Sequence, residues 1–145
     1  MIYPATEAIQ KAMQAHDLRC GVEERDTTSA VHVGINSENA SFEVLFITNN
    51  DENDAAVRIF DLIRFPAEKY DAIAEKVNEC NCRYRYIKFG IDTNHNTVDA
   101  EYDLPISETD PGECAYEILM RCAHIIDACY PQLMQVLSGE EKEES

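Results

Sequence analysis

Glycine is scarce in this sequence and is never clustered. The five glycines stand singly along the 145 residues, at Gly21, Gly34, Gly90, Gly112 and Gly139. A phosphate-binding loop or a dinucleotide fingerprint needs several glycines at fixed spacing, and the nucleophile elbow of α/β-hydrolases needs the pattern G-x-S-x-G. The sequence contains none of these patterns. We therefore predict no catalytic residues and a protein that is not an enzyme.

Basic residues are also scarce. The chain has 12 Lys and Arg residues against 28 Asp and Glu residues, which gives a formal net charge of −16 at pH 7. A protein that binds nucleic acid or an anionic membrane surface neutralises phosphates with Lys and Arg. We therefore expect neither nucleic acid nor a membrane among the partners of this chain.

Long hydrophobic runs are absent. No stretch approaches the ~18 consecutive apolar residues of a membrane-spanning helix. The start of the chain, Met1 to Pro4, lacks the basic segment and apolar run of a signal peptide. We therefore expect a cytoplasmic protein. In that compartment the six cysteines are expected to be reduced thiols rather than disulfides, and mostly small buried apolar residues.

Apolar residues recur with helical and strand periods. Helical spacing predicts helices at Pro4–Leu18, from Pro66 to about Asn81, and from Pro111 to about Val136, with a kink or break one turn before Pro131. Alternation predicts strands at Ala30–Asn36, Ser41–Thr48, Ala56–Phe65, Arg85–Asp92 and Thr97–Leu104. The order α-β-β-β-α-β-β-α predicts an α+β fold, a two-layer domain with an antiparallel five-stranded sheet. We expect one domain over residues 1–138 and a disordered acidic tail over residues 139–145.

With these elements placed, the sequence resembles the YbjN family, a family of bacterial sensory transduction regulators. The likeness rests on Val57-Arg58-Ile59-Phe60, on Phe65-Pro66, on Val77-Asn78-Glu79-Cys80-Asn81, on Phe89-Gly90-Ile91-Asp92 and on Val98. The resemblance implies a fold similar to that of type III secretion chaperones. It also implies a homodimeric, non-enzymatic module that holds a partner polypeptide.

The second and third predicted strands present apolar residues on both faces. If all helices cover one face, the other exposes an apolar patch, which usually marks a binding surface. The predicted partner-binding residues are Leu45, Ile47, Phe60, Leu62, Arg58 and Arg64. Three occupants remain open: the last helix, a second copy of the chain, or a partner polypeptide. The arginines could attract an acidic peptide or balance neighbouring acids such as Asp61.

Two further alternatives concern small ligands. Cys80 and Cys82 could act as a thiol or zinc sensor, although structural zinc sites more often use C-x₂₋₄-C pairs. A further hypothesis is a small-molecule-binding regulator whose pocket lies between sheet and helices. The stretch from Asp92 to Asn96 imitates a calcium loop but has Thr97 where glycine is needed, so we interpret it as a hairpin turn. We predict no metal site and no cofactor.

Overall fold

The computed structural model describes residues 1–51, 53–106 and 110–139. In chain order its elements are α1 (Pro4–Ala15), β1 (Cys20–Glu24), β2 (Thr28–Asn36), β3 (Ser41–Asn49), β4 (Asp54–Arg64), the 3₁₀ helix η1 (Ala67–Lys69), α2 (Tyr70–Arg83), β5 (Lys88–Asp92), β6 (Thr97–Pro105) and α3 (Pro111–Ser138). The strands form one antiparallel sheet in the order β1-β2-β3-β4-β6-β5. The predicted α+β class with an antiparallel sheet is confirmed.

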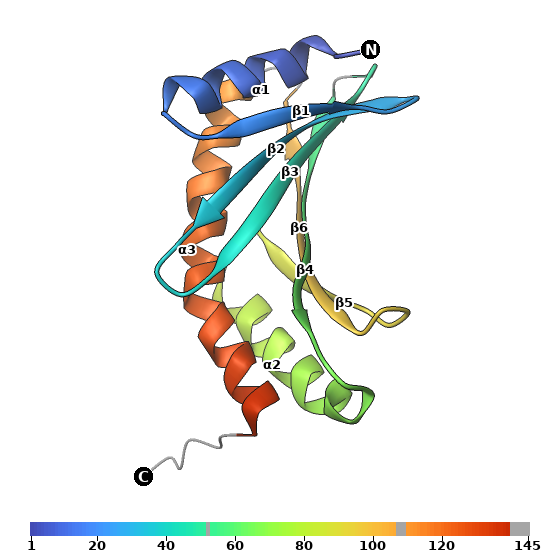
Figure 1. The fold of residues 1–145 in the computed structure, drawn as a ribbon, viewed down its shortest axis with the longest axis vertical. Helices are drawn as coiled ribbons and strands as arrows, with labels where there is room; N and C mark the ends of the chain where they lie inside the picture. Colours follow the sequence, from blue (N-terminus) through green and yellow to red (C-terminus); the bar gives the residue numbers. More distant parts are fainter. Residues whose placement is uncertain (52, 107–109, 140–145) are drawn as a thin grey trace.

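The helices pack on one face of the sheet (Figure 1). Helix α1 contacts β1, β2 and β3 as well as α3, and α2 contacts β5 and α3. Alternate strand residues point into this layer because successive side chains of a strand point to opposite faces. Val33, Phe46 and Ile59 from the sheet lie in the same core as Leu119 and Ile126 from α3, and all five are almost fully buried.

The predicted strand count is wrong, because the described part of the chain contains six strands rather than five. The missed strand is β1, and its inclusion changes the order to α-β-β-β-β-α-β-β-α. The sequence of β1, Cys-Gly-Val-Glu-Glu, shows no apolar alternation, and its residues Cys20 to Glu23 are all half-buried. A short edge strand of this kind leaves little periodic signal.

Two predicted boundaries also move. Helix α1 ends at Ala15 rather than at Leu18. Strand β5 begins at Lys88 because Tyr86, with φ 72°, lies in the left-handed region and interrupts the extended backbone.

Of the kink or break expected before Pro131, a break does not occur, because α3 is continuous from Pro111 to Ser138. Proline cannot donate to the carbonyl four residues earlier, here that of Asp127. The side-chain amide of Asn39, in the β2–β3 turn, donates to this carbonyl instead, at 3.2 Å. The expected helix start is confirmed, since the carboxylate of Asp110 accepts from the N–H groups of Gly112 and Glu113. Of the expected tail, residues 140–145 lie outside the described ranges.

Strand β4 carries an irregularity that shapes the candidate site. Its register with β6 shifts between Ile59 and Ile63, and Asp61 lies there with φ 55°. The backbone N–H of Asp61 donates to Oδ1 of Asp99 at 2.9 Å, which holds the bulge against β6. On its other side, β4 shares a register with β3 over three residue pairs, and beyond them the two strands diverge (Figure 1).

Candidate partner-binding face

The side of the sheet turned away from the helices, here called the outer face, is ordered by strand register. Directly paired residues lie side by side on the same face. The registers align two neighbouring rows across the sheet: Gly21, His32, Leu45, Arg58, Glu101 and Lys88 in the first, and Glu23, Ala30, Ile47, Ala56 and Asp103 in the second. The second row is apolar in its middle, the first has Leu45 beside Arg58 there, and each contains an acidic residue on β6.

The centre of the outer face is an apolar strip formed by Ala30, Leu45, Ile47 and Ala56, in which Ala30 is only 5% exposed and the other three are half-buried. Leu45 and Ile47 are half-buried and stand outside the hydrophobic core that the helices cover. Helix α3 contributes its buried residues to that core. Of the three occupants that the sequence left open, the last helix is therefore excluded for the strip.

The structure brings together three of the six predicted site residues, Leu45, Ile47 and Arg58. Phe60 lies at the β4 bulge and is 56% exposed, the largest exposure of any hydrophobic side chain on the described strands. Leu62 packs against the core instead, and Arg64 stands at the end of β4. The bulge separates Phe60, Leu62 and Arg64 from Leu45, Ile47 and Arg58.

Both predicted arginines are already paired with acids of the chain. Arg58 donates to Asp103 at 2.9 Å and lies 3.6 Å from the carboxylate of Glu101. Arg64 pairs with Asp61 at 3.1 Å. One guanidinium thus faces two carboxylates at Arg58, and Lys88 lies beside Glu101 in the same row. The interpretation that the arginines balance neighbouring acids fits these contacts better than the attraction of an acidic peptide.

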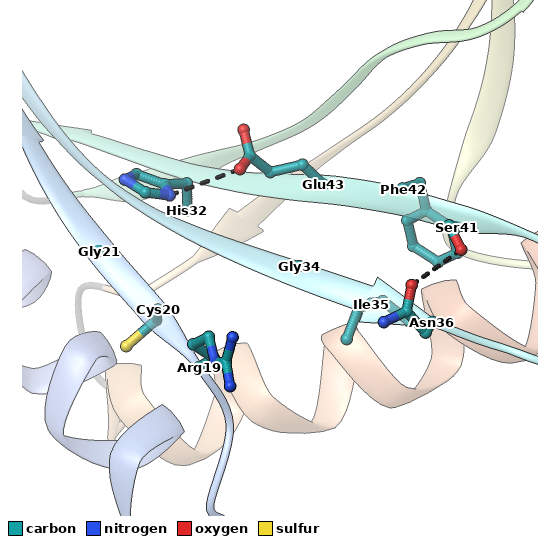
Figure 2. A pocket seen from close by; sticks show the side chains of 10 residues that line it. All are labelled: Arg19, Cys20, Gly21, His32, Gly34, Ile35, Asn36, Ser41, Phe42 and Glu43. Atoms are coloured by element: carbon teal, nitrogen blue, oxygen red, sulfur yellow. Dashed lines mark hydrogen bonds and ion pairs between the residues drawn. The ribbon is translucent and has the colours of Figure 1, made fainter.

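A hollow of about 860 Å³ lies beside the strip, where β1 begins and the β2–β3 hairpin turns (Figure 2). The imidazole of His32 lies over Gly21, where a Cβ atom would come within 2.5 Å of the ring. Its Nδ1 lies 3.5 Å from the carboxylate of Glu43. Glu43 lies two residues before Leu45 on β3, where it pairs with Gly34 of β2, so it adds an acidic residue at one end of the apolar strip.

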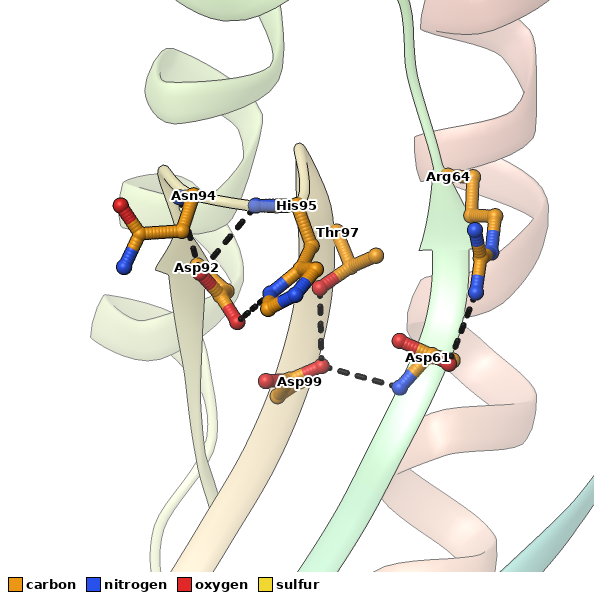
Figure 3. Close-up of polar contacts among 7 residues, drawn as sticks. All are labelled: Asp61, Arg64, Asp92, Asn94, His95, Thr97 and Asp99. Atoms are coloured by element: carbon orange, nitrogen blue, oxygen red, sulfur yellow. Dashed lines mark hydrogen bonds and ion pairs between the residues drawn. The ribbon is translucent and has the colours of Figure 1, made fainter.

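In the turn from Asp92 to Asn96, which imitates a calcium loop, the Asp92 carboxylate is engaged by hydrogen bonds within the turn (Figure 3). The carboxylate of Asp92 accepts from the backbone N–H groups of Asn94 and His95 and contacts Nδ1 of His95 at 2.8 Å. The hydrogen bond from His95 holds the pKa of Asp92 below its usual value, and the same bond raises the pKa of His95. In the part of the chain that the structure describes, no three His, Cys, Asp or Glu side chains converge as a metal site requires.

Cys80 and Cys82 do not form one site. Cys80 is buried and Cys82 is exposed, because positions two apart on a helix point to different sides. Cys80 instead meets Cys129 of α3, and the hydrogen bond between the two thiols lowers the pKa of Cys80 and raises that of Cys129.

The edges of the sheet are less open than its outer face. At β5, the side-chain amide of Asn81 accepts from the N–H of Phe89 at 2.7 Å and donates to its carbonyl at 2.9 Å. Asn81 thereby replaces a neighbouring strand at this point. At the other edge, α1 packs on β1, and the Cys20 thiol contacts the carbonyl of Gln10. A partner that adds a strand to the β5 edge must displace the contacts of Asn81.

Comparison with known families adds one match. Residues 5–134 match the family model of YbjN, described as "Putative bacterial sensory transduction regulator". The chain belongs to the YbjN family. The motifs that carried the resemblance occupy β4, the start of η1, the C-terminal part of α2 and the β5–β6 hairpin of this YbjN chain. No curated protein and no solved structure matches it significantly, so the similarity to type III secretion chaperones stays a prediction.

Some site residues of this YbjN protein escaped sequence reasoning. Ala30 and Ala56 complete the apolar strip, and Glu43, Glu101 and Asp103 border it, but only strand register brings these residues together. Alternation along each strand could have placed them on the outer face. Within the described residues, no helix has the length and apolarity needed to cross a membrane.

Proposed function

We propose that this YbjN protein is a non-enzymatic regulatory module of the cytoplasm that binds a partner polypeptide on the outer face of its sheet. The observation that carries the proposal is the apolar strip in mid-sheet on the face without helices, whose accessible surface comes from the half-buried Leu45, Ile47 and Ala56. An uncovered apolar strip rimmed by charges is the usual form of a protein-binding surface.

The charges around the strip indicate the kind of partner. Glu43 lies at one end of it along β3, and Glu101 and Asp103 lie on β6 beside Arg58 and Ala56. The side chains of these acids are exposed, whereas that of Arg58 is 23% exposed and is engaged by two of them. Complementary charge across an interface guides association and excludes wrong partners. The partner segment is therefore one with apolar anchors flanked by Lys or Arg.

The same charges bear on the homodimer that the family resemblance implies. Two copies that met through their outer faces would bring acidic borders together, and each copy has a net charge of −16. Like charges in contact across an interface cost free energy. We propose that any self-association uses another surface and leaves the outer face to the partner.

The test uses affinity capture followed by reconstitution. A protein enriched from the host lysate is purified, and its Kd for the full chain is measured with wild type, Leu45→Asp and Ile47→Asp. Each substitution puts a charge into the strip, and we expect at least a tenfold loss of affinity, which equals about 1.4 kcal/mol. The matched control is Met134→Asp on α3, where the native side chain is 40% exposed.

Circular dichroism and thermal melting check that each variant folds. The proposal also predicts that the Kd weakens as salt increases, because the acidic borders contribute to binding. Equal affinity for wild type and both strip variants would overturn the proposal, as would an equal loss in Met134→Asp. If a partner binds through the strip without salt dependence, only the proposal that this partner is basic is wrong.

A further inference from the structure

A second hollow, here called the Tyr86 hollow, lies on the helix side of the molecule, away from the outer face. It has a volume of about 450 Å³ and is lined by Arg85, Tyr86, Glu117, Met120, Arg121, His124 and Ile125. The lining comes from the segment before β5 and from the middle of α3. Small-molecule sites usually have volumes of ~300–1,000 Å³ and apolar walls with a few polar groups.

The conformation of Tyr86 marks this hollow. Its φ of 72° lies in the left-handed region, which a bulky side chain rarely adopts. Glycine or asparagine would suit this backbone position better. Burial does not account for the choice of tyrosine, because the side chain is 40% exposed. Backbone strain of this kind tends to occur at binding and active sites.

Contacts nevertheless hold the Tyr86 ring in a fixed place. The Arg121 guanidinium lies 4.7 Å from the ring centroid, and the Tyr102 ring meets Tyr86 edge-on at 6.0 Å. Arg121 is itself held by Glu117, whose carboxylate accepts from it at 2.7 Å. Met120 stands next to these groups and is 37% exposed. The hollow thus has a prearranged wall of one aromatic ring and one thioether.

The charge of the hollow is opposite to that of the molecule. Arg85 and Arg121 line it with a single acid, Glu117, so its formal charge is positive with His124 neutral, although the whole chain carries −16. A guanidinium binds a carboxylate through paired N–H donors, and an apolar wall binds a ring or an acyl chain. We propose that the Tyr86 hollow binds a small molecule with an apolar or aromatic body and a carboxylate.

A free small molecule fits better than an extended peptide. A peptide leaving the hollow along β5 would need the edge groups of Phe89, and the amide of Asn81 already binds them. The volume also suits a ligand of one or two rings. This inference does not depend on the proposed function, because the hollow shares no residue with the outer face.

The test is a titration of the ¹⁵N-labelled full chain with 2-naphthoate, followed by NMR. Its neutral analogue 2-naphthamide has the same rings without the charge. We expect saturable shifts at Tyr86, Met120 and His124, and at least tenfold weaker binding of the amide. Arg85→Gln should weaken naphthoate binding several-fold, and Met120→Glu should abolish it through like-charge repulsion.

The chain offers a matched control. Met134→Glu makes the same change further along α3, at a side chain that is 40% exposed, and should leave the affinity within twofold. Leu45→Asp on the outer face should also leave it unchanged. Equal binding of acid and amide would overturn the proposal, as would shifts centred elsewhere. So would the lack of saturation by about 10 mM naphthoate, ten times a weak Kd of 1 mM. If an acidic peptide saturates the hollow while naphthoate does not, the small-molecule assignment is wrong.

Discussion

Asn39 and Asp127 join the β2–β3 turn to the middle of α3 through three hydrogen bonds. The N–H of Asn39 donates to the Asp127 carboxylate at 2.7 Å. Its side-chain amide donates to the same carboxylate at 3.3 Å and to the Asp127 backbone carbonyl at 3.2 Å. That carbonyl is the one for which Pro131 supplies no donor. The turn therefore supplies the hydrogen-bond donor that the helix lacks at Pro131. It also holds the β2–β3 hairpin, which contains Leu45, against α3.

The first prediction concerns the pH dependence of this link. The bond from the Asn39 backbone lowers the pKa of Asp127, so its contribution to stability is present above the usual carboxylate value of 3.8 and is lost as pH falls through the lower folded value. A proline that replaces Asn39 removes the donor N–H. Asn39→Pro should therefore raise the pKa of Asp127 measured by NMR and lower the free energy of unfolding more at neutral pH than in acid. An equal loss at both pH values would contradict the prediction.

The second prediction concerns a buried trio of hydroxyls. Oγ1 of Thr6 on α1 lies 2.7 Å from Oγ of Ser29 and 2.6 Å from Oγ1 of Thr48, and all three residues are almost fully buried. Thr6→Val keeps the shape but leaves two hydroxyls without this partner. We expect a loss of about 1–3 kcal/mol in urea unfolding. The control Thr93→Val, in an exposed turn, should change stability by less than about 0.5 kcal/mol. Similar losses in both variants would contradict a role for the trio.

The third prediction concerns the crossing of α1 and α3. A Cβ atom at Gly112 would lie 2.6 Å from the backbone oxygen of Ala8 and 2.9 Å from Cβ of Ala12. Gly112→Ala should therefore force the helices apart and cost about 1–3 kcal/mol, despite the better helix propensity of alanine. At Gly34 a Cβ atom meets nothing within 4 Å. Gly34→Ala should lose no stability. Thermal melting of Gly112→Ala and Gly34→Ala measures this difference in stability.

Local pattern accounts for what the sequence could predict. The apolar spacing of α3 and the alternation in β2, β3, β4 and β6 are strong signals, and each gave an element close to its observed bounds. The left-handed Tyr86 and the bulge at Asp61 depend on tertiary contacts. Periodicity therefore predicted that β5 and β4 run through these positions as regular strands. The requirement for glycine at position 112 likewise depends on the close approach of α1 to α3, which local sequence does not show.

The candidate site, too, depends on contacts that the sequence pattern does not show. Alternation placed Leu45 and Ile47 on one face. The border acids Glu101 and Asp103 belong to β6, which pairs with β4 as well as with its sequence neighbour β5. The register of β4 with β6 puts Glu101 and Asp103 beside Arg58 and Ala56. A prediction of the acidic border therefore needed the strand order, which depends on long-range pairing.

The last prediction separates four of the six thiols by reactivity. Cys82 is exposed, whereas Cys80, Cys122 and Cys129 are buried. Burial raises the pKa of Cys122 to about 12, which leaves almost no thiolate at neutral pH. Although its pKa is lowered, Cys80 is shielded from reagents between α2 and α3. Native alkylation with iodoacetamide, read by peptide mass spectrometry, should modify Cys82 first and the buried three only after unfolding. Cys82→Ser should remove the fast phase without loss of stability. If Cys80 reacts as fast as Cys82 in the folded chain, the α2–α3 contact opens in solution, and a sensing role for Cys80 and Cys129 becomes the better explanation of that pair.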